Sequence, residues 1–377
     1  MNSRERVLAA LNHQEADRIP IHDSPWAATV LRWEQEGLPP GVSPAEYFDY
    51  ELVSFGADCS PRLPVRVLEE TDEYIVATTP YGGIRRNHKD FSTTPEVIDY
   101  PCKSRADWER LKERLQPDAD RVNWSGVVEE DEVTRRSAVR QQRRALRYAG
   151  LEGCRRARAD GKFVCYSAAV GYDLLQSYVA TERLLMAVAL EPEWLIDMYE
   201  TTADLVIAMC EIMRQGGFEF DGAFLYCDLG YRNGPFFSPR HYEEQLHPTF
   251  QRLFGYFNDH NMPVILHSCG DVRMFIPYFI QEGLTCLQPL EVKAGMDVVA
   301  LKEQWGDQLA FMGGIDVRAM SADDPALIEE EIRRKIPVAK RGGGYIYHSD
   351  HSVPNTVSWE RYKYVMELVH RYGQYGD

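Results

Sequence analysis

From residue 162 to residue 373 the sequence alternates short apolar segments with longer amphipathic ones, and this rhythm limits the folds open to the chain. Each apolar segment is typical of a buried strand and each longer segment of a helix. Strands that alternate with helices form a parallel sheet with right-handed crossovers. Two earlier strand-like stretches, at 17–23 and 51–59, complete a set of eight predicted strands.

Eight such units predict a (β/α)8 TIM barrel, with an open doubly wound sheet as the alternative. We expect one barrel domain over residues 1–377, with an N-terminal amphipathic helix within residues 1–11 that Asn2 or Ser3 caps. Residues 62–92 alternate in the manner of a β-hairpin, and residues 104–160 are charged and helical in pattern. We therefore expect an insertion at about 62–160, between the second and third strands.

The composition narrows the classes of partner. The chain has 58 acidic and 42 basic residues, a formal net charge of −16, which argues against binding to nucleic acid or to an anionic membrane. No run has the eighteen or so apolar residues of a membrane span, and the N-terminus lacks an apolar signal core. Eight scattered cysteines without a CxxC motif indicate reduced thiols. We expect a cytoplasmic protein, and a homodimer is compatible with the sequence.

One strand-like run, from Pro263 to Asp271, ends in residues capable of chemistry. Residues two apart on a strand share a face, so His267 and Cys269 can point to one spot. A His-x-Cys pair offers the nitrogen and thiolate ligands that suit zinc. Core packing is the alternative, because buried cysteines are commonly inert.

A zinc site needs three or four ligands, so the pair requires a third. The richest supply is the strand-like run from Gly342 to Pro354, which contains His348, Asp350 and His351. Each of these side chains is able to bind a metal. From the residues alone, all three are candidates.

Polar residues also stand at the other predicted strand ends. In a barrel these ends converge on the carboxyl-terminal rim, where the active sites of this fold lie. Groups from separate strands can therefore meet there. The predicted rim residues are His22, Asp23, Asp228, His267, Cys269, Glu291, Asp316, His348, Asp350 and His351.

Several segments resemble those of the uroporphyrinogen decarboxylase-like superfamily. The likeness runs from one end of the chain to the other and is weakest over 62–160. It implies a (β/α)8 barrel, in agreement with the strand count. The segments are the opening stretch 3–20, Cys227-Asp228-Leu229-Gly230 with Ser238-Pro239, and residues 263–272, 290–297 and 311–316.

That superfamily contains true decarboxylases and cobalamin-dependent methyltransferases. The decarboxylases carry an Arg-rich loop after the first strand, whereas the matching residues here, His22 to Trp26, contain no Arg. The methyltransferase branch holds zinc on a His-x-Cys pair and a late Cys. Here His267 and Cys269 match the pair, and His351 stands where the late Cys would be.

The resemblance thus implies a zinc site made of His267, Cys269 and His351. Glu291 and Asp350 are alternative ligands. His348 is expected either to join them or to support the neighbouring loop.

We therefore expect a corrinoid-dependent methyltransferase that carries out the O-demethylation of a small methylated substrate, such as a methoxylated aromatic compound. The corrinoid (cobalamin) is expected on a separate partner protein, because the chain has no segment typical of a cobalamin module. Asp228 is the expected catalytic residue and would orient the substrate or a ligand. The expected substrate-binding residues are His22, Trp26, Tyr172 and Tyr226, although the aromatic ones also fit a buried core.

Two other functions fit the same residues. The first is a metal-independent decarboxylase or lyase of a small carboxylic acid, which would use Asp228 and a histidine of the late loop. The second is a non-catalytic binding protein that keeps the barrel and its pocket. Zinc content separates the methyltransferase from the first, and methyl transfer separates it from the second.

Overall fold

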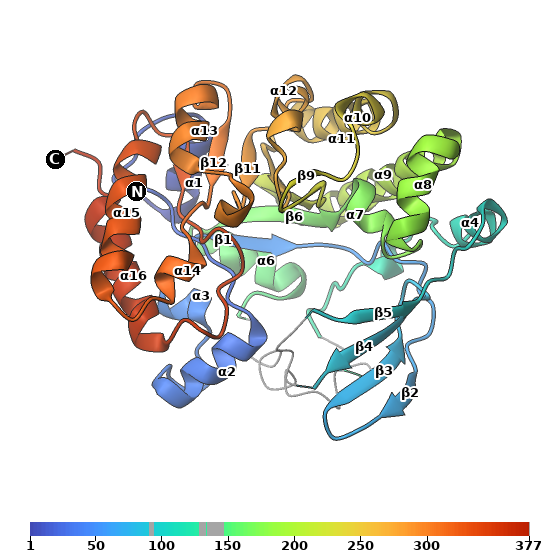
Figure 1. Ribbon diagram of the computed structural model, residues 1–377, viewed down its shortest axis with the longest axis horizontal. Coiled ribbons are helices and arrows are strands. Elements are labelled where there is room, and N and C mark those ends of the chain that lie inside the picture. Colours follow the sequence, from blue (N-terminus) through green and yellow to red (C-terminus); the bar gives the residue numbers. More distant parts are fainter. Residues whose placement is uncertain (90–93, 128–132, 134–146, 377) are drawn as a thin grey trace.

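The computed structural model describes residues 1–89, 94–127, 133 and 147–376. Its centre is a seven-stranded sheet in the order β1-β6-β7-β10-β11-β12-β13 (Figure 1). Every neighbouring pair is parallel, as predicted. The strands are β1 (Leu52–Phe55), β6 (Phe163–Ala169), β7 (Gly222–Tyr226), β10 (Val264–His267), β11 (Cys286–Gln288), β12 (Ala310–Met312) and β13 (Tyr345–Ile346).

Residues 20–22 close this sheet into a barrel. Tyr347, just after β13, donates its N–H to the Pro20 carbonyl at 2.9 Å, and its own carbonyl accepts the His22 N–H at 3.1 Å. On the other side, Glu51 donates its N–H to the Ile21 carbonyl at 3.0 Å. The predicted first strand thus lies between β13 and β1 and takes the eighth position. The chain has the predicted TIM-barrel-like fold.

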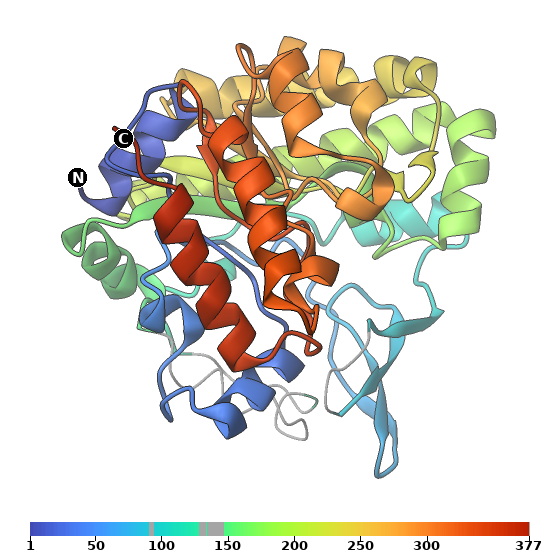
Figure 2. The ribbon, with the colours of Figure 1, turned by 60° about the vertical axis from the view of Figure 1, so that its left-hand side comes forward.

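Helices surround the sheet, as the ribbon shows from two directions (Figures 1 and 2). The longer ones follow the predicted alternation with the strands. They are α1 (Ser3–Leu11), α2 (Ala27–Glu36), α3 (Pro44–Tyr47), α4 (Arg105–Lys112), α6 (Gly150–Ala159), α7 (Gly171–Leu175), α8 (Thr181–Leu190), α9 (Pro192–Gln215), α10 (Pro239–Gln245), α11 (His247–Asp259), α12 (Ile276–Gln281), α13 (Val298–Trp305), α14 (Val317–Met320), α15 (Pro325–Ala339) and α16 (Trp359–Tyr372), with 3-10 turns η1 (Ala119–Arg121), η3 (Arg273–Phe275) and η4 (Val292–Ala294).

Two amphipathic segments of the chain each form a pair of helices rather than one. The segment 238–259 forms α10 and α11, which separate at Leu246. Pro248 stands in the first turn of α11, where its missing N–H costs no hydrogen bond. The segment 171–190 forms α7 and α8, and between them the Tyr178 carbonyl accepts the Cys102 N–H at 3.0 Å. That bond ties the barrel to the chain that follows the inserted sheet.

The inserted chain between β1 and β6 forms a sheet of its own. Its antiparallel strands are β2 (Val67–Glu70), β3 (Tyr74–Thr78), β4 (Ile84–His88) and β5 (Glu96–Asp99). The predicted hairpin is therefore β3–β4 with one further strand on each side, an arrangement that pairs both edges of the hairpin. Of the predicted helical stretch 104–160, residues 128–132 and 134–146 lie outside the described residues. Figure 1 shows this sheet on the side toward which the β1 arrow points.

Apolar side chains fill the barrel and the layer around it. One buried cluster joins residues of the barrel strands, such as Phe163, Phe224 and Ile265, to Val7 and Leu11 of α1. Helix α1 therefore covers the end of the barrel at which the strands begin, opposite their carboxyl ends. Its N-terminus is capped by Asn2, which accepts a hydrogen bond from the Glu5 N–H.

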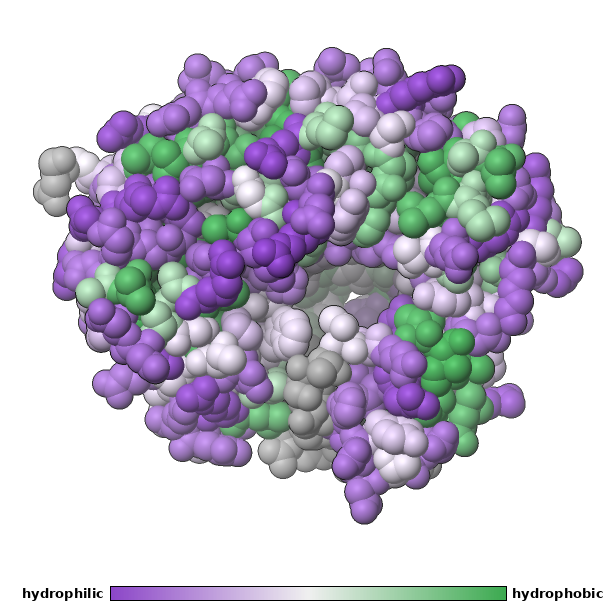
Figure 3. Space-filling model, in the orientation of Figure 1, coloured by the Kyte–Doolittle hydropathy of each residue, from purple (hydrophilic) through white to green (hydrophobic). Residues whose placement is uncertain are grey.

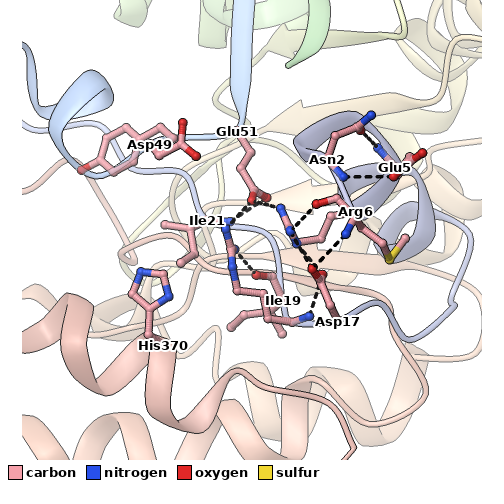
Figure 4. A network of polar contacts seen from close by, with 12 residues as sticks. Asn2, Glu5, Arg6, Asp17, Ile19, Ile21, Asp49, Glu51 and His370 are labelled. Carbon is pink, nitrogen blue, oxygen red and sulfur yellow. Dashed lines mark hydrogen bonds and ion pairs between the residues drawn. The ribbon is translucent and has the colours of Figure 1, made fainter. Parts of the chain in front are cut away.

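A buried group of charges fastens α1 and the closing segment to β1 (Figure 4). The fully buried Glu51 accepts hydrogen bonds from Arg6 Nη1 at 2.5 Å and Arg18 Nη2 at 2.7 Å. Its second oxygen accepts the Ile21 N–H at 3.2 Å. Burial raises the pKa of Glu51, and the two guanidinium groups oppose that rise. We infer that Glu51 is ionised and holds the first and second strand positions together.

In the described part of the chain, no helix combines the length and the apolar character needed to cross a membrane. All eight cysteines are unpaired thiols.

Glu51→Gln is expected to lower the free energy of unfolding by about 3–5 kcal/mol, because the guanidinium groups of Arg6 and Arg18 lose the buried charge that compensates them. Urea denaturation measures this loss. The matched control is Arg240→Ala, which breaks an exposed pair with Glu244 on α10 and should leave the midpoint unchanged. A similar midpoint in both variants would contradict the role given to Glu51.

Candidate functional site

Three metal-ligating side chains meet at the carboxyl ends of two neighbouring strands. His267 is the last residue of β10, Cys269 follows two residues later, and Asp228 follows β7, which pairs with β10. One ligand atom from each residue lies within 4.8 Å of the other two. In the described residues this is the cluster of histidine, cysteine and acidic groups close enough to share one metal ion. We call these three residues the HCD cluster.

The loops that carry the cluster are packed tightly against each other. Asp228 accepts the Cys269 N–H at 2.8 Å, and Ser268 Oγ accepts the Leu229 N–H at 3.1 Å. Gly270 has a φ of +81°, and a Cβ there would lie 2.3 Å from the carbonyl carbon of Gly230. Only glycine fits such a close approach of two backbones. The backbone thus brings Asp228 to the His-x-Cys pair.

The imidazole of His267 is held on both sides. Its Nδ1 lies 2.5 Å from Gln288 Oε1, which can only accept, so Nδ1 carries the proton. Its Nε2 lies 3.4 Å from Cys269 Sγ and 3.5 Å from Asp228 Oδ1. The unprotonated nitrogen therefore faces the other two members of the HCD cluster.

The electrostatics of the cluster favour a bound cation. Burial raises the pKa of the Cys269 thiol well above its usual range, and the carboxylates of Asp228 and Glu291 raise it further. Burial lowers the pKa of His267, against the pull of Asp228. Without a metal, the cluster therefore holds a neutral thiol and a neutral imidazole beside a carboxylate. A divalent cation would stabilise the thiolate, and three nitrogen, sulfur and oxygen donors suit a zinc ion with one open position.

His351, the predicted third ligand, does not join the HCD cluster in this structure. Its ring lies edge-on to Trp26, with the ring centroids 6.4 Å apart. Burial lowers the pKa of His351, whereas the nearby carboxylates of Glu291 and Asp228 act to raise it. His351 is thus a neighbour of the cluster, and the third position is taken by Asp228.

The two predicted alternative ligands bind backbone. Asp350 accepts the Val292 N–H at 3.0 Å and the Val317 N–H at 2.9 Å, one on each oxygen. Glu291 accepts the Gly270 N–H at 2.7 Å and pairs with Lys293 at 2.8 Å. Both carboxylates therefore shape the loops around the cluster. Asp316, also at the rim, caps α14 by accepting the Arg318 N–H.

The predicted substrate-binding residues are divided between the rim and the interior. Tyr226 is 37% exposed, and its ring lies 5.1 Å from that of His267. The ring centroids of His22 and His348 are 6.1 Å apart. The Nδ1 atom of His22 is buried and has no hydrogen-bond partner among the described residues. Tyr172 is fully buried against Phe236 and Phe237. Of these three residues, Tyr226 is the most exposed.

Two residues of the site were not predicted from the sequence. Gln288 ends β11 and binds both His267 and His348. Asp173 lies in α7, and burial together with the charge of Asp228 raises its pKa to about 7, whereas Arg85 of β4 lowers it. Gln288 had a signal in the sequence, because it lies three residues before the predicted rim residue Glu291. Asp173 had none, because its partners come from distant segments.

Comparisons with known proteins show the family to which the chain belongs. The model of the uroporphyrinogen decarboxylase (URO-D) family matches residues 130–372. The chain is 28% identical over 150 residues to the uroporphyrinogen decarboxylase of Trichlorobacter lovleyi and 27% identical over 150 residues to that of Geobacter sulfurreducens. Each alignment covers 37% of this chain and 40% of the relative, so the chain matches less than half the length of these decarboxylases.

A solved structure described as a methyltransferase from Methanosarcina mazei has a similar fold. It superposes with a TM-score of 0.62 over 99% of both chains, at 14% sequence identity. Identity this low speaks for the fold and not for the activity. Because the family match covers more than half of the sequence, the chain belongs to the uroporphyrinogen decarboxylase (URO-D) family.

Proposed function

We propose that this protein is a zinc-dependent methyltransferase, which moves a methyl group from a small methylated substrate to the corrinoid of a partner protein. The observation that carries the proposal is the HCD cluster, in which His267 Nε2, Cys269 Sγ and a carboxylate oxygen of Asp228 converge at the strand ends. The description of the Methanosarcina mazei structure as a methyltransferase supports it. So does the absence of arginine from residues 22–26, where a decarboxylase of this family binds its acidic substrate.

Breaking a methyl ether leaves the bonding electron pair on oxygen, so the leaving atom needs stabilisation. His267, Cys269 and Asp228 would hold the zinc ion, which supplies a Lewis acid for that atom. A corrinoid bound to the partner protein would supply the nucleophile for the methyl group. Tyr226 offers an aromatic surface beside the cluster, and Figure 3 shows the molecule hollowed between the barrel and the inserted sheet.

The departing oxygen must also take up a proton. Burial and the charge of Asp228 raise the pKa of Asp173 to about 7, so this carboxyl keeps its proton to a higher pH than an ordinary aspartate does. It lies near enough to Asp228 to feel that carboxylate's charge.

The purified protein is expected to retain about one zinc ion per chain after dialysis, whereas His267→Ala and Cys269→Ala should lose it, because only two donors are left. Elemental analysis measures the metal. Methyl transfer is followed by the loss of cob(I)alamin absorbance with a panel of methoxylated and methylated compounds. Cys59→Ala, which removes a thiol outside the HCD cluster, should retain both zinc and activity.

Equal zinc in the wild type and in Cys269→Ala would remove the proposed ligand set. Release of carbon dioxide from a small carboxylic acid by the zinc-free protein would favour a decarboxylase instead.

Replacement of the two candidate third ligands should give different results. Asp228→Ala is expected to weaken zinc binding at least about 10-fold, since it removes a donor of the cluster, and His351→Ala is expected to weaken it less. Titration of the metal-free protein against a zinc chelator measures both constants. A larger loss in His351→Ala would mean that this loop moves to complete the site when zinc binds.

Asp173→Asn is expected to stabilise the folded protein at pH 8 by about 1–4 kcal/mol and to change little at pH 4. The folded-state pKa of about 7 lies above the unfolded value of about 4, so the folded state favours the protonated acid. That contribution is present below about pH 4 and is lost as the pH rises through 7. Urea denaturation at the two pH values tests this, with Asp72→Asn at an exposed position as the matched control.

A further inference from the structure

A chain of buried hydrogen bonds leads away from His267 across the barrel interior. Gln288, only 3% exposed, lies between two imidazoles. Its Oε1 accepts the His267 Nδ1–H at 2.5 Å, and its Nε2 lies 3.4 Å from His348 Nε2. His348, 2% exposed, continues the chain to the carbonyl of Ser349, 2.7 Å from its Nδ1.

A backbone carbonyl fixes the direction of this whole chain. Because the Ser349 carbonyl can only accept, His348 Nδ1 must carry a proton, and in the neutral ring His348 Nε2 must accept. The Gln288 amide then has to turn its NH2 group toward His348 and its oxygen toward His267. The His267 proton is thereby placed on Nδ1, and the lone pair is left on Nε2.

Ser349, whose carbonyl ends this chain of hydrogen bonds, is itself anchored. The buried Asp23 accepts the Ser349 hydroxyl at 2.5 Å and the Ser349 N–H at 3.4 Å. Ser24 Oγ lies 3.3 Å from His348 Nε2 and can donate to it, which agrees with Nε2 as an acceptor. A reversed amide would set its oxygen against the unprotonated Nε2 of His348, so two buried acceptors would face each other.

We propose that Gln288 is a positioning residue for the metal centre. Through it, the carbonyl of Ser349 keeps His267 in the tautomer whose Nε2 lone pair faces Cys269 and Asp228. The loop that carries His351 thus acts on the His267 ligand from three strands away. As a statement about metal binding, this inference rests on the proposed zinc site; as a statement about the tautomer, it stands on the hydrogen bonds alone.

The first experiment measures zinc affinity in the purified full-length chain by chelator competition. Gln288→Leu, which keeps the bulk but not the amide, is expected to weaken zinc binding by about 10- to 100-fold. Gln288→Glu keeps an acceptor for His267 Nδ1–H and is expected to restore most of the affinity. The matched control is Gln245→Leu, another buried glutamine, whose amide donates to the Val188 carbonyl outside the site and whose loss should leave zinc affinity unchanged.

The second experiment needs no metal. In protein labelled with ¹⁵N-histidine, the ring-nitrogen shifts report which nitrogen of each histidine is protonated, and His267→Ala identifies the signals of His267. The metal-free wild type is expected to show His267 protonated at Nδ1, and Gln288→Leu is expected to lose that preference. Unfolding midpoints show whether each variant remains folded.

The outcomes separate this inference from the proposed function. An unchanged tautomer and unchanged zinc affinity in folded Gln288→Leu would overturn the positioning role and leave the zinc site intact. A protein that binds no zinc but shows the Nδ1–H tautomer dependent on Gln288 would overturn the proposed function and support the role of Gln288. Loss of both the tautomer and the affinity in Gln288→Leu, with recovery of affinity in Gln288→Glu, would support both.

Discussion

The structure depends on the buried contact between Glu51 and the two arginines, Arg6 and Arg18. A barrel has no free edges only if its first and last strands meet, and here the first strand position is a segment of only a few residues. Arg6 of α1 and Arg18, just before the segment 20–22 that closes the barrel, both bind the carboxylate of Glu51, the residue before β1. Since charges this deeply buried are costly when unpaired, the contact also selects one register for the closing segment.

When the sheet closes into a barrel, the carboxyl ends of its strands form a ring. The residues of the candidate site lie on this ring. Asp228, Glu291 and Asp350 come from different strand ends, yet each accepts backbone N–H groups from a neighbouring loop. These carboxylates at the rim therefore mainly fix the positions of the loops. Asp228 is the exception, because it holds the Cys269 backbone and also faces the His267 ring.

The loops of the site are held by many hydrogen bonds, but two of its side chains lie where their ionised forms are disfavoured. The half-buried Cys269 thiol lies among negative charges, and the half-buried Asp173 lies near a second carboxylate. A cation at the HCD cluster would stabilise the ionised Cys269 thiolate. Protonation of Asp173 removes the repulsion between its carboxylate and that of Asp228. Groups with strongly shifted pKa values that gather at one end of a barrel are typical of a functional site. The bonds of Gln288 and His348 add a rigid support behind His267.

The sequence by itself determined the features that depend on near neighbours in the chain. Strand and helix periods predicted the parallel barrel, and the two-residue repeat of a strand placed His267 and Cys269 on one face. The positions of Asp228 and the late loop at strand ends followed from the same pattern. The likeness to the URO-D superfamily agreed with the barrel and named the family.

The tertiary structure alone decided which side chains meet. Asp228 rather than His351 lies beside the pair, because Asp350 fixes its loop by accepting N–H groups from two other loops, and His351 packs on Trp26 instead. The support of His267 by Gln288 and the raised pKa of Asp173 likewise arise from contacts between distant segments. Periodicity reports the face on which a residue lies, but the distance between two loops depends on backbone hydrogen bonds that no local pattern encodes.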